Sequence, residues 1–163
     1  MISHYRIDSR VVHGQTTTRI TKEHPADGVL IVDDEIAQDA FMLEVYKSAL
    51  GAGTRLLAFS VEKALKKLPE DAASKKNYIV IFKHTETARR MVEQGYVFTG
   101  TLNIGPQPNG DDARLIEKML YLTPSQIEDL DALQEHGVQL IINPAFTTPN
   151  LSWNNAKQKA GVA

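Results

Sequence analysis

The stretch Gly28-Val29-Leu30-Ile31-Val32 is an unbroken run of glycine and aliphatic residues, bounded by Asp27 and Asp33. A strand that is buried on both faces of a parallel sheet has this continuous apolar character, whereas a half-exposed strand alternates between apolar and polar residues. The stretch Tyr78-Ile79-Val80-Ile81-Phe82 has the same character. Two such strands predict a sheet that is covered by helices on both faces.

Strand-like and helix-like patterns alternate along the chain. The expected strands cover residues 2–7, 28–32, 55–59, 78–82, 99–104 and 138–142, with a short one near 117–121. Apolar residues recur at three- and four-residue spacing over 34–50, and a helix start at Thr123 carries proline and glutamine in its first turn. We therefore predict an α/β fold, an open twisted sheet of about seven strands, mostly parallel, with helices on both faces.

No linker or repeat divides the 163 residues, so we predict a single domain over residues 1–163. Residues 144–163 hold the only tryptophan, Trp153, and continue beyond the last expected strand. We expect them to form a tail packed on the surface, with room for one short helix.

Composition excludes several classes of function. The formal net charge is −2, which gives no reason to expect nucleic acid as a partner. The absence of cysteine rules out disulfides, thiol nucleophiles and thiolate metal sites. Since no apolar run is long enough to span a bilayer and no signal peptide is evident, we expect a cytoplasmic protein.

A polar stretch follows the first expected strand directly: Arg6-Ile7-Asp8-Ser9-Arg10-Val11-Val12-His13-Gly14-Gln15. A helical pattern begins at about Gln15, and the N–H groups of a helix start favour an anion. We predict that His13 accepts a phosphoryl group and that Arg10 offsets its charge. Backbone N–H groups near Gly14 and Gln15 would assist. Asp8 is expected either to position Arg10 or to orient the loop by hydrogen bonds.

Other polar residues follow strands at the same predicted edge of the sheet, where ligands bind in open α/β folds. Asp33, Ser60 and His84 are therefore further candidates for contact with the phosphate. Asp33 and Asp34 together suggest an alternative, a phospho-acceptor pair as in receiver domains. In receivers, however, the acidic pair follows the first strand, and the simpler interpretation is that Asp34 caps the next helix.

The stretch 6–15 resembles the motif R-[IV]-D-x-R-[LVF]-[IV]-H-G-Q of the IIB components of mannose/fructose/sorbose-type sugar phosphotransferase systems. The resemblance continues at residues 32–39, 60–64, 102–105 and 136–138 and so covers nearly the whole chain. It implies a seven-stranded sheet with one antiparallel strand. The loop Gly105–Gly110, rich in proline, departs from the step that relatives commonly have there.

The resemblance also implies a function. His13 would receive phosphate, through its Nδ1 atom, from a histidine of a separate IIA protein or domain. It would pass the phosphate to a sugar held by the membrane-embedded IIC and IID components, with which the protein would associate at the membrane. No metal or organic cofactor is expected for this chemistry.

Three alternatives remain open beside this hypothesis. One is a non-catalytic regulatory or binding module of the same fold. Another is a small hydrolase or lyase with His13 as general base, although no second catalytic acid stands at a fixed spacing. The third is the receiver-like use of Asp33 and Asp34. Association into a homo-oligomer is compatible with all of them.

Overall fold

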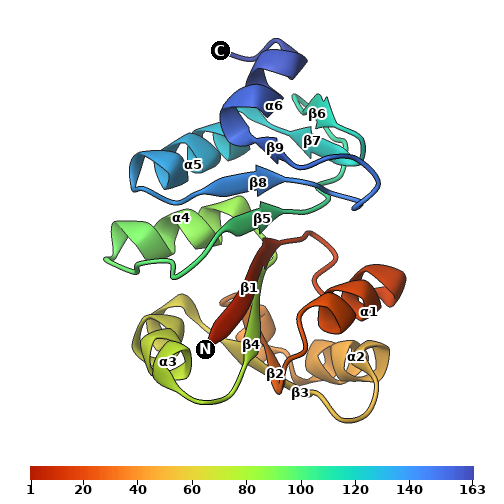
Figure 1. Ribbon diagram of the computed structural model, residues 1–163, viewed down its shortest axis with the longest axis vertical. Coiled ribbons are helices and arrows are strands. Elements are labelled where there is room, and N and C mark those ends of the chain that lie inside the picture. The colour runs from red at the N-terminus through yellow and green to blue at the C-terminus, as the bar shows by residue number, and fades with distance from the viewer.

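The computed structural model describes the backbone of residues 1–163 and the side chains of all of these except residues 15 and 16. The strands of its main sheet are β1 (Ile2–Ile7), β2 (Gly28–Val32), β3 (Arg55–Phe59), β4 (Tyr78–Phe82), β5 (Leu102–Ile104), β8 (Leu140–Ile142) and β9 (Leu151–Ser152). They are arranged in the order β3-β2-β4-β1-β5-β8-β9, and only the β8–β9 pair is antiparallel (Figure 1). The predicted fold class, a seven-stranded and mostly parallel sheet, is confirmed.

The seventh strand comes from a different part of the chain than the pattern suggested. Residues near 117–121 belong to a separate hairpin, formed by β6 (Arg114–Glu117) and β7 (Leu120–Leu122). The strand that completes the main sheet is β9, within the segment 144–163 that was expected to be a surface tail. The side chain of Trp153 in that segment is fully buried, because its indole packs into the main apolar core. This segment is therefore part of the sheet and its core.

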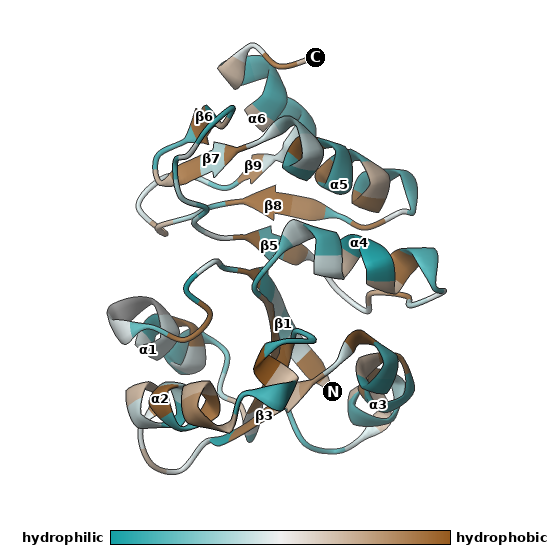
Figure 2. Ribbon diagram, turned by 180° about the vertical axis from the view of Figure 1, so that it is seen from behind, coloured by the Kyte–Doolittle hydropathy of each residue, from teal (hydrophilic) through white to brown (hydrophobic). Residues whose placement is uncertain are grey.

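Helices cover both faces of the sheet (Figure 1). They are α1 (Gly14–Glu23), a short 3₁₀ helix η1 (Ile36–Gln38), α2 (Ala40–Leu50), α3 (Val61–Ala73), α4 (Thr85–Glu93), α5 (Pro124–Glu135) and α6 (Trp153–Ala160). One apolar cluster combines residues of α1 and α2 with one face of the sheet, and the other combines α3, α4, α5 and α6 with the opposite face. Figure 2 shows the apolar strands between these two helical layers.

The helix expected over 34–50 is divided at its beginning. Asp33 accepts hydrogen bonds from the backbone N–H groups of Glu35 and Ile36 and so caps the 3₁₀ turn η1, while Asp39 caps α2. Asp34, the predicted cap, instead accepts from the N–H of Val61 at the start of α3. Carboxylates thus cap these helix starts, but Asp34, the one predicted to cap the helix that follows it, caps α3 instead.

The parallel strands bring several loops to one edge of the sheet. Strand β1 lies between β4 and β5, and all three run in the same direction. The chain leaves β1 at Asp8, whose N–H donates to the carbonyl of Phe82 at the end of β4. Across the other side of β1, the N–H of Gly105 donates to the carbonyl of Ile7. The loop that carries His13 therefore begins at the middle of the carboxyl edge, between two neighbouring strand ends.

Candidate functional site

The His13 ring is held by a buried carboxylate. Its Nε2 atom lies 3.0 Å from Oδ2 of Asp8, a residue that is only 1% exposed. A neutral imidazole that donates its Nε2–H to this carboxylate has Nδ1 as its unprotonated nitrogen. The side chain of His13 is 17% exposed, so the ring reaches solvent while one of its nitrogens is fixed.

Arg6 lies behind Asp8 and is fully buried. Its Nε donates to Oδ2 of Asp8 at 3.2 Å, Nη1 donates to the side-chain oxygen of Asn103, and Nη2 donates to the carbonyl of Pro144 at 2.7 Å. The same Oδ2 atom thus meets both the guanidinium and the imidazole. Arg6, Asp8 and His13 form a continuous chain from the interior to the surface.

Electrostatics keep Asp8 ionised. Burial by itself would raise the pKa of Asp8, but the hydrogen bond from His13 and the charge of Arg6 outweigh burial and hold that pKa below its usual value. Burial also lowers the pKa of Arg6, and the charge of Asp8 opposes this effect. A guanidinium nevertheless remains protonated at neutral pH. The ionised carboxylate of Asp8 is therefore always available to accept a hydrogen bond from the His13 ring.

The backbone around His13 is constrained. His13 is the N-cap residue of α1, and its N–H donates to the hydroxyl of Thr17. Val11 has a φ of 61°, a left-handed conformation that is exceptional for a β-branched side chain, and Gly14 has a φ of 35°. Such strained residues persist where the surrounding structure holds them, and they cluster at functional sites. Glycine adopts the positive φ at position 14 without steric cost.

Arg10 is exposed and close to this chain of residues. Its N–H donates to Oδ1 of Asp8 at 3.0 Å, so Asp8 orients the loop through the backbone of Arg10. The residue also lines a cavity of about 240 Å³, together with Pro106, Pro108 and Tyr121. The proline-rich loop 105–110 therefore forms one side of the cavity next to Arg10.

Asp33, Asp34 and His84 meet in a second cluster along the same edge. They line a cavity of about 240 Å³ with Arg90, and Nε2 of His84 lies 3.9 Å from Asp33. Asp34 also accepts from Arg90 at 2.8 Å. The bond from the Val61 N–H, followed by that from Arg90, lowers the pKa of Asp34. These carboxylates are thus occupied as helix caps and ion-pair partners.

The other predicted residues have separate positions. Ser60, a candidate for contact with the phosphate, is the N-cap of α3, where its hydroxyl accepts from the N–H of Lys63. The side chain of Gln15 lies outside the described part of the chain. The structure therefore joins Asp8 and His13 directly, with Arg10 beside them, and separates Asp33, Ser60 and His84 from that group.

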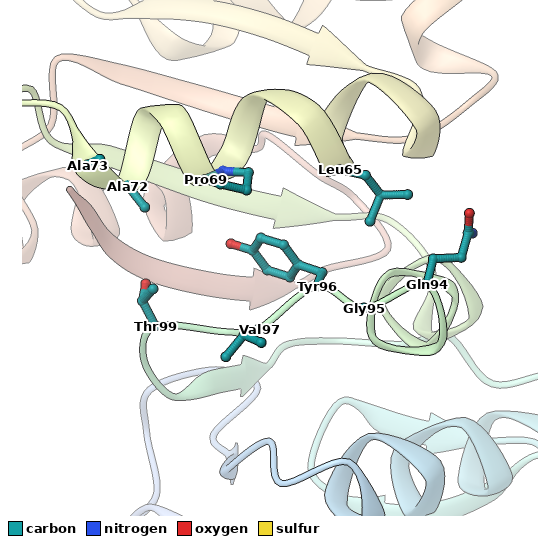
Figure 3. Close-up of a pocket in the computed structure, with 9 residues that line it drawn as sticks. All are labelled: Leu65, Pro69, Ala72, Ala73, Gln94, Gly95, Tyr96, Val97 and Thr99. Carbon is teal, nitrogen blue, oxygen red and sulfur yellow. The ribbon is translucent and has the colours of Figure 1, made fainter.

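A further cavity, of about 530 Å³, is unrelated to this chemistry. It lies between α3 and the segment 94–99, with Leu65 and Pro69 on one side and Tyr96 and Val97 on the other (Figure 3). The hydroxyl of Tyr96 is bonded to that of Tyr5, and burial raises its pKa. Because this segment leads into the beginning of β5, the cavity is at the edge opposite to His13.

Sequence reasoning missed Arg6 and Asn103 as parts of the site. A signal for Arg6 was present, since residues two apart in a strand face the same side and Asp8 stands at that spacing. A cation in a strand near the centre of a sheet needs a buried partner. The role of Asn103 and of the Pro144 carbonyl depends on strand order, which residue spacing does not reveal.

Fold and site together define a class of protein: an open α/β domain in which a solvent-reachable histidine is held by a buried carboxylate at the carboxyl edge of the sheet. A family model described as "PTS system sorbose subfamily IIB component" matches residues 2–162. The chain therefore belongs to this family of IIB components of sugar phosphotransferase systems, as its motif indicated.

Individual proteins agree with this assignment. The fructose-specific EIIB component of Bacillus subtilis is 30% identical over 83% of this chain and 82% of its own length. The mannose-specific EIIAB component of Escherichia coli is 25% identical over 90% of this chain, which spans 45% of that protein. The crystal structure of the IIBSor domain of the sorbose permease from Klebsiella pneumoniae superposes with a TM-score of 0.87, at 26% identity, over 98% of this chain and 97% of that one.

The family defines the general activity. IIB components are phosphotransferases, which accept a phosphoryl group and transfer it to a sugar, and they work with IIA and with IIC/IID permease partners. This chain is a phosphotransferase of that kind. Among the described residues, no helix has both the length and the apolar character that a membrane crossing requires.

Proposed function

We propose that His13 carries the phosphoryl group and that the chain is a phosphocarrier between a IIA phosphohistidine and a sugar. The observation that supports this role is the 3.0 Å contact between Nε2 of His13 and Asp8. It fixes one ring nitrogen and leaves the other with a free electron pair, which is the requirement for a nucleophile.

The proposed transfer is an in-line displacement at phosphorus. The Nδ1 lone pair of His13 forms the new N–P bond as the N–P bond of the donor histidine breaks, and the donor imidazole leaves with that electron pair. The Nε2 proton of His13 remains hydrogen-bonded to Asp8, whose negative charge stabilises the ring as it becomes positive. In the second step a sugar hydroxyl oxygen forms a bond to phosphorus as the Nδ1–P bond of His13 breaks. The hydroxyl proton passes to water, and the ring keeps the electron pair of the broken bond and so returns to the neutral form with its proton on Nε2.

Arg10 and the start of α1 stabilise the transferred group in this proposal. Arg10 is exposed, its N–H donates to the same carboxylate that holds the His13 ring, and a guanidinium pairs well with phosphate oxygens. Helix α1 begins at Gly14 with no acidic residue in its first turn, so its free N–H groups present positive potential. Neither contribution requires a metal or an organic cofactor.

We further propose that the protein acts in the cytoplasm, at the inner surface of a membrane-embedded IIC/IID permease. The donor would be a phosphorylated IIA protein, or a IIA domain such as the name of the EIIAB relative indicates. His84 is exposed at the same edge as His13, and we assign it to the surface that meets these partners. Asp33 and Ser60 hold the neighbouring loops by capping helices.

The test uses a phosphorylated IIA protein as the donor and measures acid-labile, base-stable phosphate on this chain. We expect His13→Ala to abolish labelling and Arg10→Ala to slow it about 100-fold, since one charge-stabilising group is lost. His136→Ala is the matched control, because His136 is exposed at the end of α5 and bonds only to its own helix among the described residues. Labelling of the His13→Ala protein would refute the proposal.

A further inference from the structure

Two guanidinium groups lie over the ring of Phe146. The Cζ atom of Arg6 is 4.6 Å from the ring centroid, and Cζ of Arg19 is 5.0 Å from it. Arg6 belongs to β1 and is bonded to Asp8, whereas Arg19 belongs to α1, the helix that His13 caps. A cation over an aromatic face is attracted to it, and the attraction is larger when the cation is desolvated, as Arg6 is.

The backbone of Phe146 is strained. Its φ of 57° is left-handed, a conformation that is unfavourable for a bulky side chain. The loop 143–150 that holds it is tied at several points. Arg6 donates to the Pro144 carbonyl at 2.7 Å, Arg19 donates to the Phe146 carbonyl at 3.5 Å, and the amides of Asn143 and Asn150 bond at 2.7 Å. Strain that is maintained by so many contacts is typical of functional loops.

The ring also packs against the apolar cluster that contains Val11 and Val12, from the loop between Asp8 and His13. Phe146 therefore contacts the strand before the His13 loop through Arg6 and the helix after it through Arg19, and it packs against the apolar cluster to which the loop contributes two valines. Phe146 takes no part in the hydrogen bonds of Asp8 and His13 described above, so any effect on them is indirect.

We propose that Phe146 is a positioning residue for phosphoryl transfer, which shields the buried Arg6–Asp8 pair from water and fastens α1 to β1. Exclusion of water strengthens the ion pair, because charges interact more strongly at low dielectric constant. A firmly held Asp8 in turn keeps the His13 ring in one tautomer and one orientation. Phosphoryl transfer depends mainly on the positioning of the reacting groups, so a small misalignment of the ring should lower the rate substantially. This inference rests on the proposed role of His13.

The test compares three substitutions of Phe146 in the full chain, with a phosphorylated IIA protein as donor. We expect Phe146→Ala to lower kcat for phosphoryl transfer about tenfold, with KM for the donor within about twofold. Phe146→Tyr should retain the wild-type rate because it keeps the aromatic face. Phe146→Leu keeps the apolar bulk but has no aromatic face, so its kcat should lie between those of the other two variants. It also gives a second test if the alanine variant folds poorly.

A second measurement separates positioning from mere stability. Nitrogen-15 NMR of His13 should show a proton on Nε2 in the wild-type protein and a mixture of tautomers in Phe146→Ala. The Nε proton of Arg6 should also exchange faster with water in that variant. Phe98→Ala is the matched control, since Phe98 is a partly buried phenylalanine packed against Tyr5 and Tyr96, near the cavity at the opposite edge. It should lose stability but keep the transfer rate and the tautomer.

The outcomes are distinguishable. If Phe146→Leu and Phe146→Ala transfer phosphate at the wild-type rate while His13→Ala does not accept it, the positioning role is wrong and the proposed function stands. If His13→Ala still accepts phosphate, the proposed function itself fails. An equal loss of rate in Phe98→Ala and Phe146→Ala would also overturn the inference, because the effect would then follow stability alone.

Discussion

Oδ2 of Asp8 lies 3.0 Å from Nε2 of His13. The same oxygen accepts from Arg6, so a single carboxylate atom joins a buried cation to the surface imidazole. Substitution of Asp8 by asparagine should therefore have two effects. The rate of phosphate uptake should fall at least about 100-fold, because the amide can present an N–H to the ring and favour the wrong tautomer. The free energy of unfolding should fall by about 3–5 kcal/mol, since Arg6 loses its buried counter-charge.

Phosphate uptake from the donor and urea unfolding would measure these two effects. Asp129→Asn is the matched control, because Asp129 is also buried and paired with an arginine, Arg89, but lies in α5. We expect this control to lose stability and to keep its rate of uptake. An Asp8→Asn protein that takes up phosphate at the wild-type rate would contradict the orienting role of Asp8.

Gly105 should not tolerate a side chain. A Cβ atom there would lie 2.5 Å from the carbonyl oxygen of Ile7 and 2.8 Å from Cζ of Arg6. We expect Gly105→Ala to lower the free energy of unfolding by about 1–3 kcal/mol, the usual cost of overpacking, and to slow phosphate uptake through displacement of Arg6. Gly110→Ala, in the same loop with nothing within 4 Å of its added Cβ, should change stability little. Thermal unfolding would compare the two, and equal melting temperatures would show that the close approach does not matter.

Stability should decline in mild acid because of His4. Its ring stacks on that of His24 with 4.5 Å between centroids, and burial, then the charges of His24 and Arg6, lower its pKa to about 3. The unfolded chain, with an ordinary histidine pKa near 6.5, binds a proton in a range where the folded chain does not. The free energy of unfolding is therefore unaffected by His4 above about pH 6.5. Below that pH it falls by about 1.4 kcal/mol per pH unit, until the pH approaches 3.

His4→Phe keeps an aromatic ring and removes this titration. The stability of the variant relative to wild type should therefore rise by up to about 2 kcal/mol between pH 6.5 and pH 5. His136→Phe, the same replacement at an exposed position at the end of α5, is the matched control. Urea unfolding at several pH values gives the comparison. Parallel pH profiles for wild type and His4→Phe would contradict the assignment.

The sequence predicted most of the sheet because its central strands are buried on both faces and therefore read as unbroken apolar runs. It failed at β9, since a strand of two residues at the edge leaves no pattern, and at the hairpin β6–β7, which resembles a strand of the main sheet when only its period is considered. Of the candidate site, the motif predicted His13, Asp8 and Arg10. Arg6, Asn103 and Phe146 depend on which strands and loops become neighbours, and such long-range proximity is not encoded in local spacing.

Two hydrogen-bond partners of Arg6 lie 97 and 138 positions further along the chain than Arg6 itself. A nascent polypeptide therefore contains the histidine motif before it contains the residues that hold Arg6, and through it Asp8 and the His13 ring, in place.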